Sequence, residues 1–394
     1  MKFKQTVKRG ALVCLGLALI GAGLFWGWAP TMVAKNLNRV HAPAAAPPPA
    51  DVQRLHDSLF VADLHADALL WNRDLLECGS YGHVDIPRLI EGGVALQGFT
   101  VVTKTPRHLN IERNDDRSDD ITLLAIAQRW PVATWFSLKA RALHQARRLH
   151  EVAARSRGRF TLILTAPDLE AYLARRAHEK GITAGFLGLE GCHALNGGLA
   201  SVDELYAAGF RMLGLTHFFD NQVGGSAHGL AKGGLTAFGR RVVQRAEELG
   251  MLIDLAHASP QLIEDVLAIA RRPLVVSHAG LRGHCDNQRN LSDDHVRRIA
   301  ATGGLIGIGF WETACCGHDA AAIAAAMRYA VGIAGIDHVA LGSDFDGAVS
   351  TPFDASGMVQ LTAALQQAGF NPAEIRKVMG DNLKELLRHH LPPR

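Results

Sequence analysis

The 394-residue chain carries almost no net charge. Its 41 lysines and arginines nearly balance 38 aspartates and glutamates, which gives a formal charge of +3. Four positive residues lie within the first nine positions, so the rest of the chain is close to neutral. A protein that binds nucleic acid through its phosphates needs a strongly basic surface. We therefore expect no nucleic-acid partner.

Cysteine is also scarce, with six residues in the whole chain. Cys14 lies in an apolar N-terminal run and the other five follow it, so at least one of those five is unpaired within a monomer. The neighbours Cys315 and Cys316 are not expected to bond to each other. One or two disulfides would suit an exported protein, but the sequence does not assign their partners.

One long stretch lacks charge altogether. Residues 11–29 are nineteen uncharged residues, rich in Leu, Gly and Ala, with two tryptophans near the end. About twenty apolar residues span a bilayer, and tryptophan favours the membrane interface. We predict a transmembrane signal anchor at 11–29 after a basic cytoplasmic segment at 1–10, with a cleaved signal peptide as the alternative. The rest of the chain would then be extracytoplasmic, or periplasmic in a Gram-negative bacterium.

The segment after the anchor has little that could pack a core. Residues 42–50 consist only of proline and alanine, a composition that favours extended chain. We predict a tether over 30–50 and one domain over 51–394. With 48% hydrophobic and 20% charged residues, the chain is globular in composition.

The domain alternates short apolar runs with mostly helical segments, which predicts a (β/α)8 TIM barrel. The expected strands are 60–64, 95–101, 183–189, 212–216, 252–256, 274–277, 305–310 and 339–343. Apolar periodicity predicts a helix over 140–157, and Asn371-Pro-Ala-Glu predicts the start of the last one. The acidic run 114–120 predicts a solvated loop and helix cap, with a substrate lid as the alternative.

Side chains of types that can bind a metal recur at the carboxyl ends of these runs. They are His65, Asp67, Glu190, His217, His257, His278 and Asp344. A TIM barrel brings its strand ends to one face. No strand ends in cysteine, which argues against a structural zinc site built on thiolates. Five of these residues, all but His217 and Asp344, make a set of nitrogen and oxygen ligands that suggests two metals sharing one carboxylate.

The sequence resembles the membrane dipeptidases, a zinc-dependent branch of the amidohydrolase-like barrels. The matching stretches extend from about residue 59 to about residue 347, and the clearest are 63–67, 188–195 and 342–347. Their order and spacing are specific, although few would stand out alone. The resemblance implies a zinc dipeptidase that cleaves dipeptides with a free C-terminal carboxylate through a water bridging two metals.

The same resemblance implies a metal-binding role for five residues. His65 and Asp67 would hold one Zn2+ ion, His257 and His278 would hold the other, and Glu190 would bridge the two. Two such ions would activate the water and polarise the scissile carbonyl.

Other residues receive roles in catalysis or substrate binding from the resemblance. Asp344 would be the general base and proton shuttle, and His217 would contact the scissile carbonyl or its oxyanion. Arg289 would bind the substrate carboxylate. Asn221 is a further candidate for substrate binding. His193 and Asp346 would support the site from outside it.

Two other functions stay open at this point. The barrel could bind a ligand without hydrolysis, although Asp344 would then have no purpose. It could also hydrolyse a lactone or cyclic amide, but such relatives usually carry H-x-H where this chain has His65-Ala-Asp67. Dipeptides and the membrane are the expected partners, and a homodimer is one of the assemblies that the sequence allows. Segments 104–182 and 218–226 differ most from the family, so the side-chain preference is open.

Overall fold

The computed structural model describes residues 2–41 and 48–393, so positions 42–47 of the predicted tether lie outside it. Its centre is a closed barrel of parallel strands. In chain order these are β2 (Val61–Ala66), β3 (Val94–Val102), β5 (Thr183–Glu190), β6 (Phe210–Gly214), β7 (Leu252–Asp254), β8 (Leu274–Ala279), β9 (Leu305–Ile308) and β10 (Val339–Leu341). Neighbouring strands pair in parallel, and β10 pairs with β2 to close the ring. The predicted TIM barrel is confirmed.

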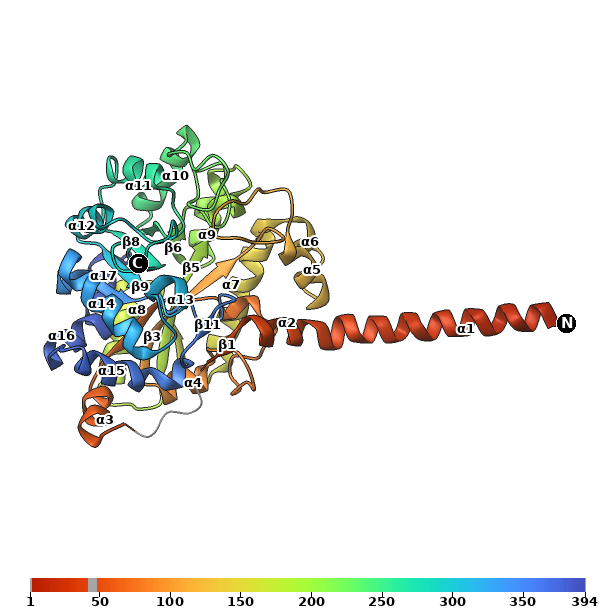
Figure 1. The fold of residues 1–394 in the computed structure, drawn as a ribbon, viewed down its shortest axis with the longest axis horizontal. Helices are drawn as coiled ribbons and strands as arrows, with labels where there is room; N and C mark the ends of the chain where they lie inside the picture. The colour runs from red at the N-terminus through yellow and green to blue at the C-terminus, as the bar shows by residue number, and fades with distance from the viewer. Residues whose placement is uncertain (1, 42–47, 394) are drawn as a thin grey trace.

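Helices surround the barrel (Figure 1). They are α3 (Ala50–Asp57), α4 (Ile86–Glu91), α5 (Asp120–Ala127), α6 (Ala133–Phe136), α7 (Leu138–Arg155), α8 (Ala166–Arg176), α9 (Ala200–Ala207), α10 (Ala237–Glu248), α11 (Pro260–Leu267), α12 (Asp293–Ala301), α13 (Glu312–Cys315), α14 (Ala320–Ala334), α15 (Met358–Gln367), α16 (Pro372–Arg376) and α17 (Asn382–His390). As predicted, Asn371 caps α16 in a capping box with Glu374.

The long segment 104–182 contains α5 to α8, of which α7 matches the helix predicted over 140–157. It also contains a strand that the sequence did not predict. This strand is β4 (Phe160–Leu162), which pairs with the start of β5 outside the ring. Three residues are too few to show an alternating pattern, which explains the omission. In the acidic run, Asp119 caps α5 by accepting a hydrogen bond from the backbone N–H of Ile121.

The lower interior of the barrel is a packed apolar core. Leu64, Leu96 and Phe186 lie there, and α8 and α17 contribute Tyr172 and Leu387 to the same buried cluster. Because this end is filled, the polar strand ends can form a cavity only at the opposite, carboxyl end.

The N-terminal residues form one long helix that projects from the barrel (Figure 1). It consists of α1 (Lys2–Gly23), a π-helical turn η1 (Leu24–Trp28) and α2 (Ala29–Leu37). Pro30 has no backbone N–H for the normal helical bond, which accounts for the irregular turn just before it. Within this helix, Leu12–Leu37 is long and apolar enough to cross a membrane, as an anchor or as a signal sequence.

Part of the predicted 30–50 tether is folded onto the barrel. After α2, the short strand β1 (Arg39–Val40) pairs in parallel with β11 (Ser350–Thr351). The Asn38 side-chain oxygen accepts a hydrogen bond of 2.9 Å from the backbone N–H of Ala348. The end of the N-terminal helix is therefore fixed beside the loop that follows β10.

Candidate metal centre and active site

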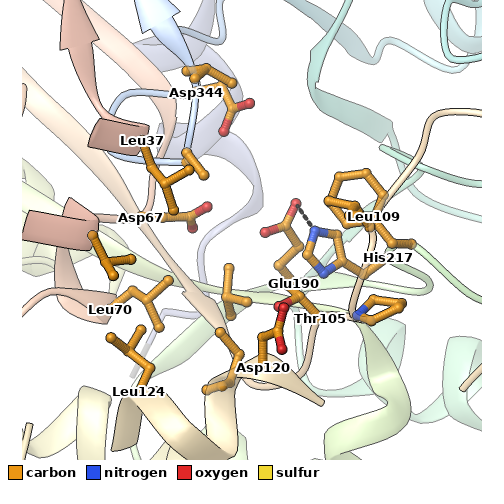
Figure 2. Close-up of a pocket in the computed structure, with 18 of the residues that line it drawn as sticks. Leu37, Asp67, Leu70, Thr105, Leu109, Asp120, Leu124, Glu190, His217 and Asp344 are labelled. Carbon is orange, nitrogen blue, oxygen red and sulfur yellow. Dashed lines mark ion pairs between the residues drawn. The ribbon is translucent and has the colours of Figure 1, made fainter. Parts of the chain in front are cut away.

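A cavity of about 780 Å³ lies at the carboxyl ends of the barrel strands. Six of the seven predicted strand-end residues line it: Asp67, Glu190, His217, His257, His278 and Asp344. The seventh, His65, is fully buried directly beneath them, with its Nε2 3.7 Å from Glu190 Oε1. Figure 2 shows Asp67, Glu190, His217 and Asp344 pointing toward the same space.

Glu190, the last residue of β5, is the centre of this cluster. Four imidazole Nε2 atoms surround its Oε1, at 3.1 Å for His257, 3.5 Å for His278, 3.6 Å for His217 and 3.7 Å for His65. These imidazoles come from four different strands or strand ends. The barrel has therefore gathered residues that are far apart in sequence around one carboxylate.

A second group of carboxylates lies beside His65. Its Nε2 is 3.6 Å from Asp67 Oδ1 and 3.8 Å from Asp344 Oδ1. Three overlapping trios have ligand atoms close enough to hold an ion: His65 with Glu190 and His278, His65 with Asp67 and Asp344, and Glu190 with His217 and His257. Glu190 and His65 each belong to two trios. His217 was not predicted to be a ligand, yet its geometry matches that of the predicted ones.

Two residues below the site orient the imidazoles. Asp254, inside β7, accepts hydrogen bonds from the hydroxyl and backbone N–H of Ser277, at 2.6 and 2.8 Å. The Ser277 hydroxyl oxygen is 2.9 Å from His65 Nδ1 and 3.0 Å from His278 Nδ1. Contacts at Nδ1 leave Nε2 facing the cavity, which is the usual arrangement for metal-binding histidines. Ser277 was not predicted to have this role.

Unpaired polar atoms show that the cluster fits a cation. Within the described part of the chain, His65 Nε2 and Glu190 Oε2 are buried without a hydrogen-bond partner. Buried polar atoms in native proteins are otherwise nearly always paired. Nitrogen and carboxylate ligands without thiolates suit zinc.

The electrostatics agree with this fit. Burial lowers the pKa of His257, His278 and His217 well below the usual value, so these rings are neutral, as metal ligands must be. Although burial opposes it, the carboxylates of Glu190 and Asp67 raise the pKa of His65 to about 10. The carboxylates thus create a negative potential at His65 that favours a proton on its ring. A bound divalent cation would offset the same potential in place of that proton.

Asp344 is held at the cavity by an unusual loop. Its backbone has a positive φ of 60°, and the adjacent Gly347 lies so close that a Cβ there would be 1.9 Å from Asp344 Oδ1. The carboxylate of Asp346 anchors the loop by accepting hydrogen bonds from the backbone N–H groups of His83 and Val84. Burial raises the pKa of Asp344 to about 8. The predicted supporting role of Asp346 agrees with these contacts.

Arg289 lies on the loop after β8 and lines the cavity, with only 6% of its surface exposed. Its Nη2 donates a hydrogen bond of 2.7 Å to the backbone carbonyl of His278. A disulfide between Cys285 and Cys316 joins this loop to the end of α13. The sequence alone could not assign that bond.

Other predicted residues lie away from the cavity. Asn221 donates to the Leu215 carbonyl and accepts from the Val223 N–H, so both ends of its amide serve its own loop. The cavity-lining residues of the described chain do not include it. His193 is buried, and its Nε2 is 2.9 Å from the Thr103 hydroxyl. Burial raises the pKa of the Cys192 thiol, which therefore stays neutral.

The rest of the cavity wall is mostly apolar and was largely missed by sequence reasoning. One side comes from the N-terminal helix, through Phe25, Ala29, Pro30, Val33 and Leu37. Another comes from the segment before and within α5, which includes Leu109, Ile111, Ile121 and Leu124. Of the acidic run 114–120, Asp120 is the one residue among those that line the cavity in the described chain.

Known proteins share the pattern of this chain over most of its length. A family model described as membrane dipeptidase, peptidase family M19, matches residues 50–390. The chain belongs to the membrane dipeptidase family. It is a metal-dependent dipeptidase, and the predicted family, fold and enzyme class are confirmed.

Several solved structures are similar to this chain along most of their length. The dipeptidase AC, a metallo peptidase of family M19, is 26% identical with a TM-score of 0.70, and the match covers 85% of this chain and 99% of that one. A metallo peptidase from Rhodobacter sphaeroides, liganded with a phosphinate mimic of the dipeptide L-Ala-D-Ala, is 25% identical with a TM-score of 0.65, covering 84% and 99%. A probable dipeptidase from Pseudomonas aeruginosa, at 19% identity and a TM-score of 0.71 over 86% and 97%, supports the fold alone.

Proposed function

We propose that this membrane dipeptidase holds two zinc ions and hydrolyses dipeptides that have a free C-terminal carboxylate. The observation that carries the proposal is the convergence of four imidazole Nε2 atoms within 3.1–3.7 Å of one oxygen of Glu190. In this proposal His65 and Asp67 would hold one ion, His257 and His278 would hold the other, and both ions would share Glu190. Two bound ions would supply an activated water and polarise the scissile carbonyl.

The protein's own residues would move the proton and hold the substrate. Asp344 is the one carboxylate of the cluster whose loop is fixed by Gly347 and Asp346. It lines the cavity with its Oδ1 3.8 Å from His65 Nε2, where it could take a proton from the activated water. The neutral His217 lines the cavity and faces Glu190, where it could donate a hydrogen bond to the carbonyl oxygen as charge develops on it.

Arg289 supports the preference for a free carboxylate. It lines the cavity beside His278, and a guanidinium binds a carboxylate through two parallel hydrogen bonds. A longer peptide would place a neutral amide there and leave the buried guanidinium without its partner, which costs affinity. This restricts the substrate to two residues.

We also propose that the N-terminal helix is retained as a membrane anchor and that the domain after it is extracytoplasmic. The apolar span Leu12–Leu37 supports the anchor, and the Cys285–Cys316 disulfide supports an oxidising compartment. N-terminal sequencing of the native protein tests this proposal. A mature terminus at or after residue 29 would establish a cleaved signal instead.

The activity is tested with the purified full chain in detergent micelles. Dipeptides with free termini, including L-Ala-D-Ala because a relative binds its mimic, are compared with C-terminally amidated and N-blocked forms and with a simple lactone. We expect cleavage of free dipeptides, weak cleavage of the amides, no lactone hydrolysis and two zinc ions per chain by elemental analysis. Cleavage of the lactone in preference to every dipeptide would contradict the proposal.

A further inference from the structure

The substrate cavity has two chemically different parts. Its floor consists of the carboxylates and imidazoles of the strand ends, whereas most of its remaining lining is apolar. One apolar wall comes from the N-terminal helix, through Phe25, Ala29, Pro30, Val33 and Leu37. These five residues form the carboxyl-terminal part of the apolar stretch Leu12–Leu37. The segment that would anchor the protein therefore also lines the cavity.

This wall is fixed to the barrel at several points. Ala34 is buried in a cluster with Leu70, Trp71 and residues of α5. Trp26 Nε1 donates a hydrogen bond of 3.2 Å to the backbone carbonyl of Ile126, at the far end of α5. At the other end of the wall, β1 pairs with β11 just after the loop that carries Asp344. Contacts with three separate parts of the barrel hold the wall in one position.

The wall lies close to the reacting groups. Figure 2 shows Leu37 on the same side of the cavity as Asp67 and Asp344, with Leu109 and His217 across from it. Val33 and Leu37 are each 43% exposed, so part of each side chain is not covered by other residues of the protein. A substrate side chain directed to this side would cover them.

The size of the cavity also points to a bulky substrate. Cavities of roughly 300–1,000 Å³ bind drug-sized ligands, and this one measures about 780 Å³. Two small residues would leave much of the apolar wall in contact with water. A branched or aromatic side chain would displace that water and bury apolar surface on both partners.

From these observations we infer that the segment from Phe25 to Leu37 is a specificity wall that selects dipeptides carrying a large apolar side chain. The inference rests on the proposed dipeptidase function and adds its substrate class. In this chain the anchor is part of the substrate site, so removing it would change which dipeptides are cleaved, not only where the enzyme resides. Hydrophobic pockets discriminate by about 10–200-fold for one methylene group.

The test compares the V33A/L37A double variant of the full chain with wild type and with N36A as the matched control. Asn36 is exposed on the same helix, and its side chain contacts Arg39 and not the cavity. The substrates are Ala-Ala and dipeptides with Phe or Leu at the first or the second position. We expect kcat/KM for at least one of the bulky dipeptides to fall about fivefold or more in V33A/L37A, with Ala-Ala changed less than twofold and N36A like wild type.

Two outcomes would overturn the inference. One is an unchanged ratio between bulky and small substrates, with or without an equal loss for both, and the other is a wild type that prefers Ala-Ala to every bulky dipeptide. Zinc content is measured for each variant, because unchanged zinc with an equal loss would show a structural role for the wall. If the wild type cleaves no dipeptide at all, the proposed function fails. If it cleaves dipeptides without the expected shift, only the specificity wall fails.

Discussion

The floor and the mouth of the cavity are built in different ways. The floor is formed by strand ends whose side chains are buried and held by hydrogen bonds, as in the chain from Asp254 through Ser277 to His65 and His278. The mouth is formed by half-exposed apolar side chains on α2 and on the segment around α5. The barrel itself fixes the reaction, whereas added segments shape the space for the substrate.

This contrast predicts two kinds of mutational effect. Changes in the floor should remove metal or lower kcat for all substrates alike. Changes nearer the mouth should leave the metals in place and alter KM or the preference between substrates. Metal content and kinetics are measured together for each variant, because only the two measurements combined distinguish a floor effect from a mouth effect.

The largest effect is expected for Glu190→Gln. A neutral amide cannot offset two cations, and Glu190 Oε1 is the atom that four imidazoles surround. Losing a partner of a metal ligand typically costs 10–100-fold in metal affinity or activity, so loss of the shared ligand should exceed about 100-fold in both. Elemental analysis and kcat/KM check this, with the exposed Glu204→Gln as control. Full loading with two zinc ions in E190Q would disprove the bridging role.

Asp344→Asn should come next in size. We expect kcat to fall by about 100–10,000-fold, the usual range for loss of a general acid–base group. The metals should stay, because in the proposed arrangement Asp344 is the base and is not one of the five ligands. The measurements are kcat and zinc content, with Asp67→Asn as a comparison that should lose zinc. Wild-type kcat in D344N would exclude Asp344 as the base.

The sequence predicts the floor far better than the mouth, for a physical reason. A strand end is visible as an apolar run followed by a polar residue, so the sequence alone was enough to place His65, Glu190 and His278. The barrel then brings them together because parallel strands share one carboxyl face. Even the floor was incomplete, since Ser277 is an ordinary residue inside a run and reveals its role only through its contacts.

The mouth could not be predicted because its residues resemble something else. Apolar residues 11–29 indicate a membrane span, and nothing in that pattern shows that the end of the same helix covers the barrel. The two-residue strand β1 is too short to give a periodic signal. The disulfide between Cys285 and Cys316 depends on two loops meeting in space, which the spacing of cysteines does not reveal.

Ser277→Ala tests whether a residue that lies beneath the metal ligands affects metal binding as the ligands themselves do. The variant removes the hydroxyl that lies 2.9 Å from His65 Nδ1 and 3.0 Å from His278 Nδ1. We expect zinc affinity to fall about 10–100-fold, with kcat recovering at saturating zinc. Ser259→Ala is the matched control, because that buried serine caps α11 and should lower thermal stability without changing zinc affinity. Equal zinc affinities in the two variants would show that Ser277 does not orient the ligands.

The smallest of these effects, and the one at the boundary between the two regions, is expected for Arg289→Ala. The guanidinium lines the cavity but donates to the His278 backbone carbonyl, so the side chain lies between ligand and substrate. If it binds the substrate carboxylate, KM for dipeptides should rise at least about tenfold, or roughly 1.4 kcal/mol, with zinc content unchanged. Arg282→Ala, on the same loop but exposed, should have no effect. Amidated dipeptides should be poor substrates of the wild type and lose little more in R289A, because the interaction is already absent. Equal cleavage of amide and free acid by the wild type would show that Arg289 does not bind the substrate carboxylate. The role of Arg289 would then be to hold the backbone of His278.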